Sequence, residues 1–264
     1  MSIDTNNNIN TIMSDEVIQH VFSFVDDGTL GKVKQVCKDW LVLATDEVFL
    51  KALYREPAEA FGEEMWKTHI GEIEQPPRLP LNIKKTLASP CPIWDGKKIK
   101  ETHILVYRPE RINGKPNTVN NIGKLVPMDG KPTGYRFICD VEEHGDTPAT
   151  EGKWLLMTKD VLPGSLGKRY ADQQELVKQL SQQTGVEYEV PHLLDTITCI
   201  FAEYKRSGKY LYGNNTYTRC QERATQGWPQ GWPLLAGGFA CEGLFVYGSC
   251  FNDDDYGVGA LRKV

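Results

Sequence analysis

The stretch SDEVIQHVFSFVDDGTLGKVKQVCKDWLVLATDEVFLKALYR, residues 14–55, repeats apolar side chains at the three- and four-residue spacing of amphipathic helices. Ser14 can cap the first of these helices, and Asp15 and Glu16 place acidic groups in its first turn. Gly28 separates the first helix from the next apolar stripe, and Pro57 ends the segment. Because so small a helical core is marginally stable by itself, we expect this segment to dock on a second domain or on a partner protein.

The composition is that of an ordinary globular protein, with 264 residues of which 40% are hydrophobic and 25% are charged. The net charge of −5 is spread along the chain, so we expect no binding to nucleic acid. No apolar run reaches the roughly 18 residues that a membrane span needs, and residues 1–11 lack the pattern of a cleaved signal peptide. These features predict a cytoplasmic protein that does not enter a membrane.

The seven cysteines do not follow the spacing of a disulfide framework or of a structural zinc site. Their number is odd, and no two of them form a CxxC pair. The five histidines are also scattered, without the spacing of a metal site. We therefore expect free thiols in a reducing compartment, with no metal and no cofactor.

The chain changes character after the first segment. Residues 56–89 contain one short helical pattern and several prolines, which predicts a connector. Residues 90–264 alternate β-rich runs at 102–107, 135–139 and 153–157 with a helix over 170–183 and a second helix after Pro191. The expected fold class is therefore α+β, with a small three-helix unit at residues 14–55 and a mixed domain at 90–264.

The first segment resembles an F-box. The most specific part of the match is the Val-Cys-Lys-Asp-Trp stretch at residues 36–40, and Met13-Ser14 replaces the Leu-Pro that usually opens the motif. The residues that match are Glu16, Val17, Ile18, Val21, Phe22, Phe24, Leu30, Val33, Val36, Cys37, Trp40, Leu43, Ala44, Asp46, Leu50 and Leu53.

This resemblance implies docking on a Skp-type adaptor and, through it, on a cullin ubiquitin ligase. In such interfaces, apolar anchors on small helices complete a core that is shared with the partner. The resemblance assigns adaptor binding to Glu16, Val17, Ile18, Val21, Phe22, Leu30, Val33, Val36, Cys37, Trp40, Leu41 and Leu50. Some of these side chains are also expected to hold the three helices together.

The second domain is similar to the formylglycine-generating (sulfatase-modifying) group of the C-type lectin-like fold. Asp172, Thr184, Gly185, Tyr188 and Pro191 fall in register with the helix and turn of that family. Gly237-Gly238-Phe239 and Gly259-Ala260-Leu261-Arg262 resemble its Gly-Gly strand and its closing strand. The acidic stretch that follows the proline in the family is replaced here by residues 192–197.

The lectin-like resemblance suggests a binding surface more than an active site. Trp228, Trp232 and Phe239 lie in a Gly- and Pro-rich stretch, where large aromatic side chains make good recognition anchors, so we predict that they bind a target. Cys241 and Cys250 lie where the formylglycine-generating enzymes hold copper, but their sequence surroundings differ, and core cysteines are the simpler interpretation. Asp253–Asp255 is expected to be a solvated turn, with calcium binding as the alternative.

The sequence thus predicts a non-catalytic adaptor that recruits an unknown target to a ubiquitin ligase. An F-box beside a domain of bacterial type resembles the effectors that intracellular bacteria deliver into the host cytosol. Two alternatives stay open at this point. One is a diverged copper-dependent formylglycine-generating oxidase, and the other is a lectin-like ligand-binding module capped by the helices.

Overall fold

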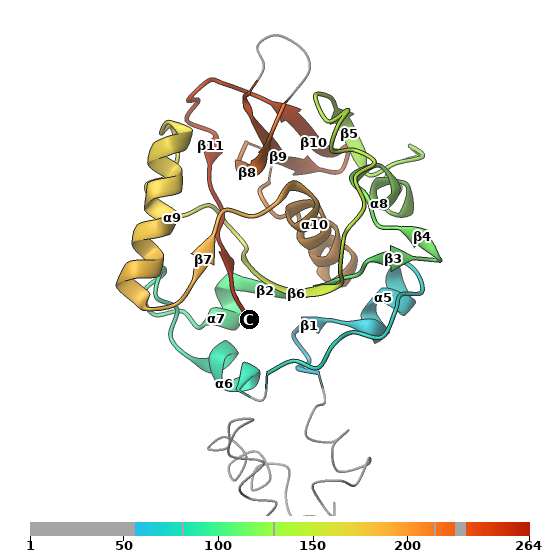
Figure 1. Cartoon of the computed structure of the whole chain (residues 1–264), viewed down its shortest axis with the longest axis horizontal. Coiled ribbons are helices and arrows are strands. Elements are labelled where there is room, and N and C mark those ends of the chain that lie inside the picture. The colour runs from blue at the N-terminus through green and yellow to red at the C-terminus, as the bar shows by residue number, and fades with distance from the viewer. Residues whose placement is uncertain (1–55, 81, 129, 214, 225–230) are drawn as a thin grey trace, which may run out of the picture. The chain divides into compact units, whose positions relative to one another are not determined.

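A computed structural model describes residues 56–80, 82–128, 130–213, 215–224 and 231–264 (Figure 1). The chain divides into two compact units, one formed by residues 58–77 and 89–264 and the other by residues 1–57 and 78–88. In the second unit, the described residues contain one helix, α6 (Ile83–Ala88). The first unit therefore takes in residues 58–77, which belong to the segment expected to be a connector.

The first unit is mixed α+β, as predicted. Its helices are α5 (Glu63–His69), α7 (Ile99–Thr102), α8 (Val119–Leu125), α9 (Tyr170–Thr184) and α10 (Leu193–Ser207). Its strands are β1 (Ala60–Phe61), β2 (His103–Arg108), β3 (Arg111–Ile112), β4 (Lys115–Pro116), β5 (Tyr135–Ile138), β6 (Lys153–Thr158), β7 (Tyr188–Glu189), β8 (Tyr217–Arg223), β9 (Pro233–Ala240), β10 (Gly243–Gly248), β11 (Tyr256–Gly257) and β12 (Leu261–Arg262). No helix among the described residues is long and apolar enough to cross a membrane.

Two five-stranded sheets form the frame of this unit. One has the strand order β1-β2-β6-β12-β7, and the other has the order β11-β8-β9-β10-β5. We call them the lower and the upper sheet, after their places in Figure 1. In the lower sheet, β12 near the end of the chain pairs antiparallel with β6 and with β7. In the upper sheet, β9 is the central strand and pairs antiparallel with β8 and with β10.

Helix α10 lies between the two sheets (Figure 1). It contacts β2 and β6 of the lower sheet and β8 and β9 of the upper sheet. Every residue from Leu193 to Glu203 is buried, which is the pattern of a core helix with no solvent face. Ile197, Ile200 and Phe201 join side chains of both sheets in one hydrophobic core. Because both sheets pack on this helix, its position sets the spacing and orientation of both.

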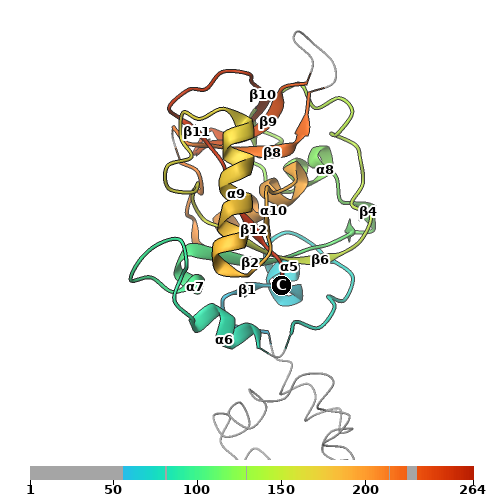
Figure 2. The same ribbon diagram turned by 60° about the vertical axis from the view of Figure 1, so that its left-hand side comes forward.

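Helix α9 packs beside the sheets over a smaller core (Figure 2). Val177 is buried there and Leu180 partly so, one turn apart on the same side of the helix. The helix ends at Gly185, which adopts the left-handed conformation (φ 65°) that favours glycine. Asn113 and Gly114 also have positive φ values and form the tight turn between β3 and β4, as the Asn-Gly dipeptide predicts.

Candidate functional site

The twelve residues predicted to bind an adaptor, from Glu16 to Leu50, lie outside the described residues. Of the three residues predicted to bind a target, Trp228 also lies outside them. Trp232 is partly exposed just before β9, and its ring lies 6.3 Å from that of the exposed Phe251. Phe239 is fully buried, with ring-centroid distances of 5.8 Å to Phe201 and 5.4 Å to Tyr204. Its ring is therefore part of the core in this structure, and Trp232 is the one of the three that the structure places partly at the surface.

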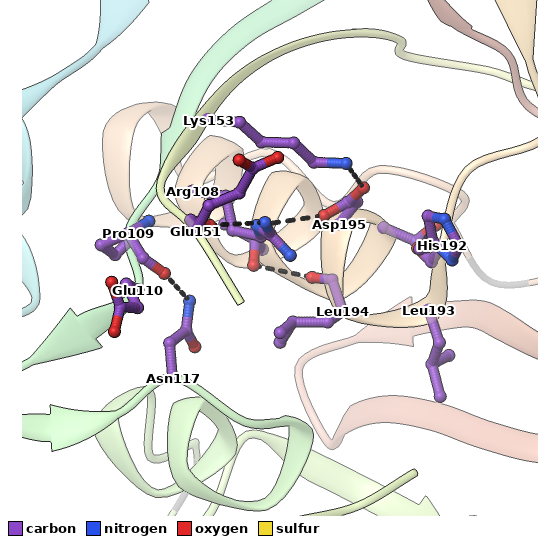
Figure 3. Close-up of polar contacts among 12 residues, drawn as sticks. Arg108, Pro109, Glu110, Asn117, Glu151, Lys153, His192, Leu193, Leu194 and Asp195 are labelled. Carbon is purple, nitrogen blue, oxygen red and sulfur yellow. Dashed lines mark hydrogen bonds and ion pairs between the residues drawn. The ribbon is translucent and has the colours of Figure 1, made fainter. Parts of the chain in front are cut away.

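A cluster of charged side chains surrounds the first turn of α10 (Figure 3). The carboxylate of Asp195 is completely buried and faces two cations, Arg108 from β2 and Lys153 from β6. Asp195 Oδ1 lies 3.3 Å from Arg108 Nε, and Asp195 Oδ2 lies 2.9 Å from Lys153 Nζ. Arg108 also donates to the carbonyl oxygen of Glu151 at 2.7 Å. The lower sheet thus supplies two positive groups to an acidic residue at the helix N-terminus, where the helix dipole also favours a negative charge.

The upper sheet reaches the same helix end through Glu222 of β8. Glu222 Oε2 accepts the backbone N–H of Leu193 at 2.7 Å, and Oε1 lies 2.9 Å from His192 Nδ1. The hydrogen bond to Glu222 raises the pKa of His192 above its usual value. Burial acts to raise the pKa of Glu222, but the hydrogen bonds from His192 and Leu193 outweigh burial and hold that pKa below its usual value.

The geometry of this charged cluster fits a structural role better than a catalytic one. A histidine oriented by a carboxylate can act as a general base, but it needs a nucleophile or a substrate proton within reach. The nearby thiols of Cys199 and Cys220 are fully buried, and burial raises the pKa of both, which keeps them protonated. The two ion pairs and the helix cap instead fix α10 to both sheets at one end.

Cys241 and Cys250 are both exposed, and they lie at opposite ends of the β9–β10 hairpin. Cys241 sits in the turn that joins the two strands, whereas Cys250 follows Ser249, whose N–H donates to the carbonyl oxygen of Pro233 at the start of β9. A strand rises about 3.3 Å per residue, so the length of β10 separates the two thiols by far more than two ligands of one metal ion allow. The pair does not fit a shared copper ion.

The acidic loop at residues 253–255 is exposed, as expected for a solvated turn. Its backbone carbonyls are used within the fold: that of Asp253 accepts from Tyr256 and that of Asp255 from Tyr217. Within the described ranges, no group of three or more His, Cys, Asp or Glu side chains is placed to hold a metal ion.

Sequence reasoning missed the partners of Asp195 and the aromatic side chains on the outside of the upper sheet. Arg108 and Lys153 carry no local signal, because they come from two strands far from Asp195 in the sequence. A usable signal was present in β10, where Leu244, Phe245, Val246 and Tyr247 alternate aliphatic and aromatic side chains with the period of a two-faced strand.

Comparison with known proteins identifies one region. The F-box-like family model matches residues 15–56, which supports the F-box prediction for that segment. No curated protein and no solved structure matches the chain.

Replacing Asp195 with Asn is expected to lower the free energy of unfolding by about 3 kcal/mol, because two cations then lose their buried counter-charge. Asp172→Asn is the matched control: Asp172 occupies the same third position of α9 but pairs with Arg169 at the exposed surface. Chemical denaturation of both variants measures the difference. Equal losses in the two variants would show that Asp195 acts only through the helix dipole.

The His192–Glu222 pair makes stability depend on pH. Because folding raises the pKa of His192, its contribution is complete below the unfolded value of 6.5 and is lost as pH rises through the folded pKa. Since this ring is 44% exposed, solvent screening limits the effect to less than about 1 kcal/mol. Denaturation at pH 6 and pH 8 should show a loss in the wild type that is absent from both His192→Gln and Glu222→Gln. A loss that persists unchanged in both variants contradicts this assignment.

Proposed function

We propose that this protein is a substrate adaptor of a cullin ubiquitin ligase. Residues 14–55 would dock as an F-box on a Skp-type adaptor, and the unit that contains residues 89–264 would recruit a target. The observation that carries the proposal is the match of the F-box-like family to residues 15–56. The mechanism is proximity, because tethering the target beside a charged ubiquitin-conjugating enzyme makes the transfer effectively intramolecular.

The contact with the adaptor is assigned to the apolar stripe and the acidic start of the F-box. Phe22 and Trp40 are its large aromatic members, and side chains of this kind dominate binding energy when they fill pockets at the centre of an interface. Glu16 contributes a charge at the start of the first helix.

The recruiting unit is proposed to be a C-type lectin-like domain. What supports this is the order of its elements: α9 with its Gly185 stop, α10, the Gly237-Gly238 strand β9, and the closing strand β12. The same elements carry the resemblance in the sequence. Its role is proposed to be non-catalytic, since Cys241 and Cys250 are too far apart for the copper site of an oxidase.

The proposed setting is a reducing cytosol, in a host cell that receives the protein from a bacterium. The six cysteines within the described residues are all free thiols, which suits a reducing compartment.

The test is binding of the full chain to a purified Skp-type adaptor, measured by co-elution in size exclusion and by calorimetry. We expect a one-to-one complex that the double variant Phe22→Ala/Trp40→Ala abolishes, because both aromatic anchors are lost. Phe251→Ala is the matched aromatic control; Phe251 is 63% exposed in the recruiting unit and should not affect adaptor binding.

A second variant separates binding from folding. Glu16→Lys reverses one charge without removing an apolar side chain, so it should weaken the complex by about tenfold while the thermal unfolding of the chain is preserved. If the wild-type chain forms no complex at micromolar concentrations, the adaptor proposal fails.

A further inference from the structure

The outer side of the upper sheet carries a row of aromatic rings that come from β8, β10 and β5 and extend over β9 between them. Phe137 comes from β5, Phe245 and Tyr247 from β10, and Tyr217 from β8; we call these four residues the aromatic face. Their neighbours Leu244 and Val246 point inward and belong to the core around α10, so Phe245 and Tyr247 lie on the opposite side of β10. Phe137 is 49% exposed, and the other three rings are partly exposed.

A glycine lets these rings form a continuous surface. Gly237 of the central strand β9 is paired with Tyr217 on one side and with Phe245 on the other. The strands β8 and β10 are two strand spacings apart, roughly 9.6 Å, yet the ring centroids of Tyr217 and Phe245 are 6.4 Å apart. The two rings therefore lean toward each other across β9. The next residue of β9, Gly238, leaves room for the Tyr217 ring, because a Cβ at this position would collide with it. The ring centroid of Tyr247 lies 5.7 Å from that of Tyr217 and 6.3 Å from that of Phe137.

Beside the aromatic face, the same side of the sheet is covered by two loops, and a buried cation, Arg219, holds these loops in place. Arg219 of β8 is 1% exposed, and its guanidinium lies 5.8 Å from the ring centroid of Tyr256. It donates to the carbonyl oxygens of Lys168 and Phe251, which fixes two loops over this half of the sheet. The hydroxyl groups of Tyr256 and Tyr247 lie 2.9 Å apart and join the covered half to the aromatic face.

Carboxylates surround the uncovered half. Asp255 adjoins Tyr217 through a backbone hydrogen bond, and Asp253 and Asp254 are exposed in the same loop. Asp140 lies at the other end, where its Oδ2 accepts the N–H of Gly248 at 3.1 Å. Two cations also lie at this border. Arg136 lies 5.0 Å over the Phe245 ring and is paired with Glu242, and the Lys131 ammonium donates to the carbonyl oxygen of Glu242. Aromatic rings with an acidic border attract guanidinium and ammonium groups by both cation–π and Coulomb interactions.

We propose that the aromatic face binds a protein segment that carries Arg or Lys between apolar side chains. The aromatic rings supply the desolvated anchors, and the acidic border selects the charge of the partner. This inference deepens the proposed function, on which it rests, by naming the chemistry of the recruited target.

Panning a phage library of short random peptides on the immobilised full chain, without any adaptor protein, tests the inference. Enriched peptides should carry Arg or Lys beside apolar residues. A synthetic copy of the most enriched peptide should bind at least about tenfold more weakly to Phe137→Ser/Phe245→Ser, and its binding should fall with added salt. Val264→Ser, at another exposed apolar residue, is the matched control and should bind as the wild type does.

A second pair of variants isolates the charge. Asp253→Asn/Asp255→Asn keeps side-chain size and should weaken binding several-fold, whereas Glu175→Gln/Glu187→Gln removes two exposed carboxylates elsewhere and should not. Three results would each overturn the inference: no peptide is enriched, the enriched peptides lack a basic residue, or the peptide binds Phe137→Ser/Phe245→Ser as tightly as it binds the wild type. So would a dimer of the chain that the aromatic variants convert to a monomer, because a second copy would then occupy the face. Since no adaptor is present, each of these results is independent of F-box docking.

Discussion

The buried carboxylate of Asp195, held between Arg108 and Lys153, is the constraint on which the architecture of this unit depends. These ion pairs fix the first turn of α10 to the lower sheet, and Glu222 fixes the same turn to the upper sheet. A buried charge is costly unless it is paired, so the helix has one favourable position between the sheets. The helix from there to Glu203 is buried on all sides, and its apolar side chains join the core of both sheets.

This internal arrangement has a consequence at the surface. Because the aliphatic side chains of β10 belong to the core around α10, its aromatic side chains face outward. The loops that bind Arg219 cover only part of this outer side of the sheet. The aromatic face is thus built on a sheet whose position is set from within. Rigid anchors of this kind lose little entropy on binding, which suits a recruiting surface. The F-box segment would supply the second attachment that an adaptor needs.

Local signals in the sequence predicted the main elements well. Helical spacing and the glycine at 185 predicted α9 almost to the residue, and the helix expected after Pro191 is α10, for whose end no position was predicted. The β-rich runs predicted β2, β5 and β6. The two-residue strands β7 and β11 were missed, because they are defined by distant partners and not by their own composition. The Asp195 cluster was missed for the same reason. Phe239 was predicted to bind a target because of its Gly-rich surroundings, but it lies on the central strand β9 and its ring packs in the core.

One chain is thus expected to bind an adaptor protein and a basic target segment at separate places. Native mass spectrometry of the full chain mixed with a Skp-type adaptor and the peptide enriched on the aromatic face measures this directly. We expect a ternary complex with one copy of each, and an affinity for the peptide that the adaptor leaves unchanged. Binary complexes alone, with adaptor and peptide displacing each other, would contradict it.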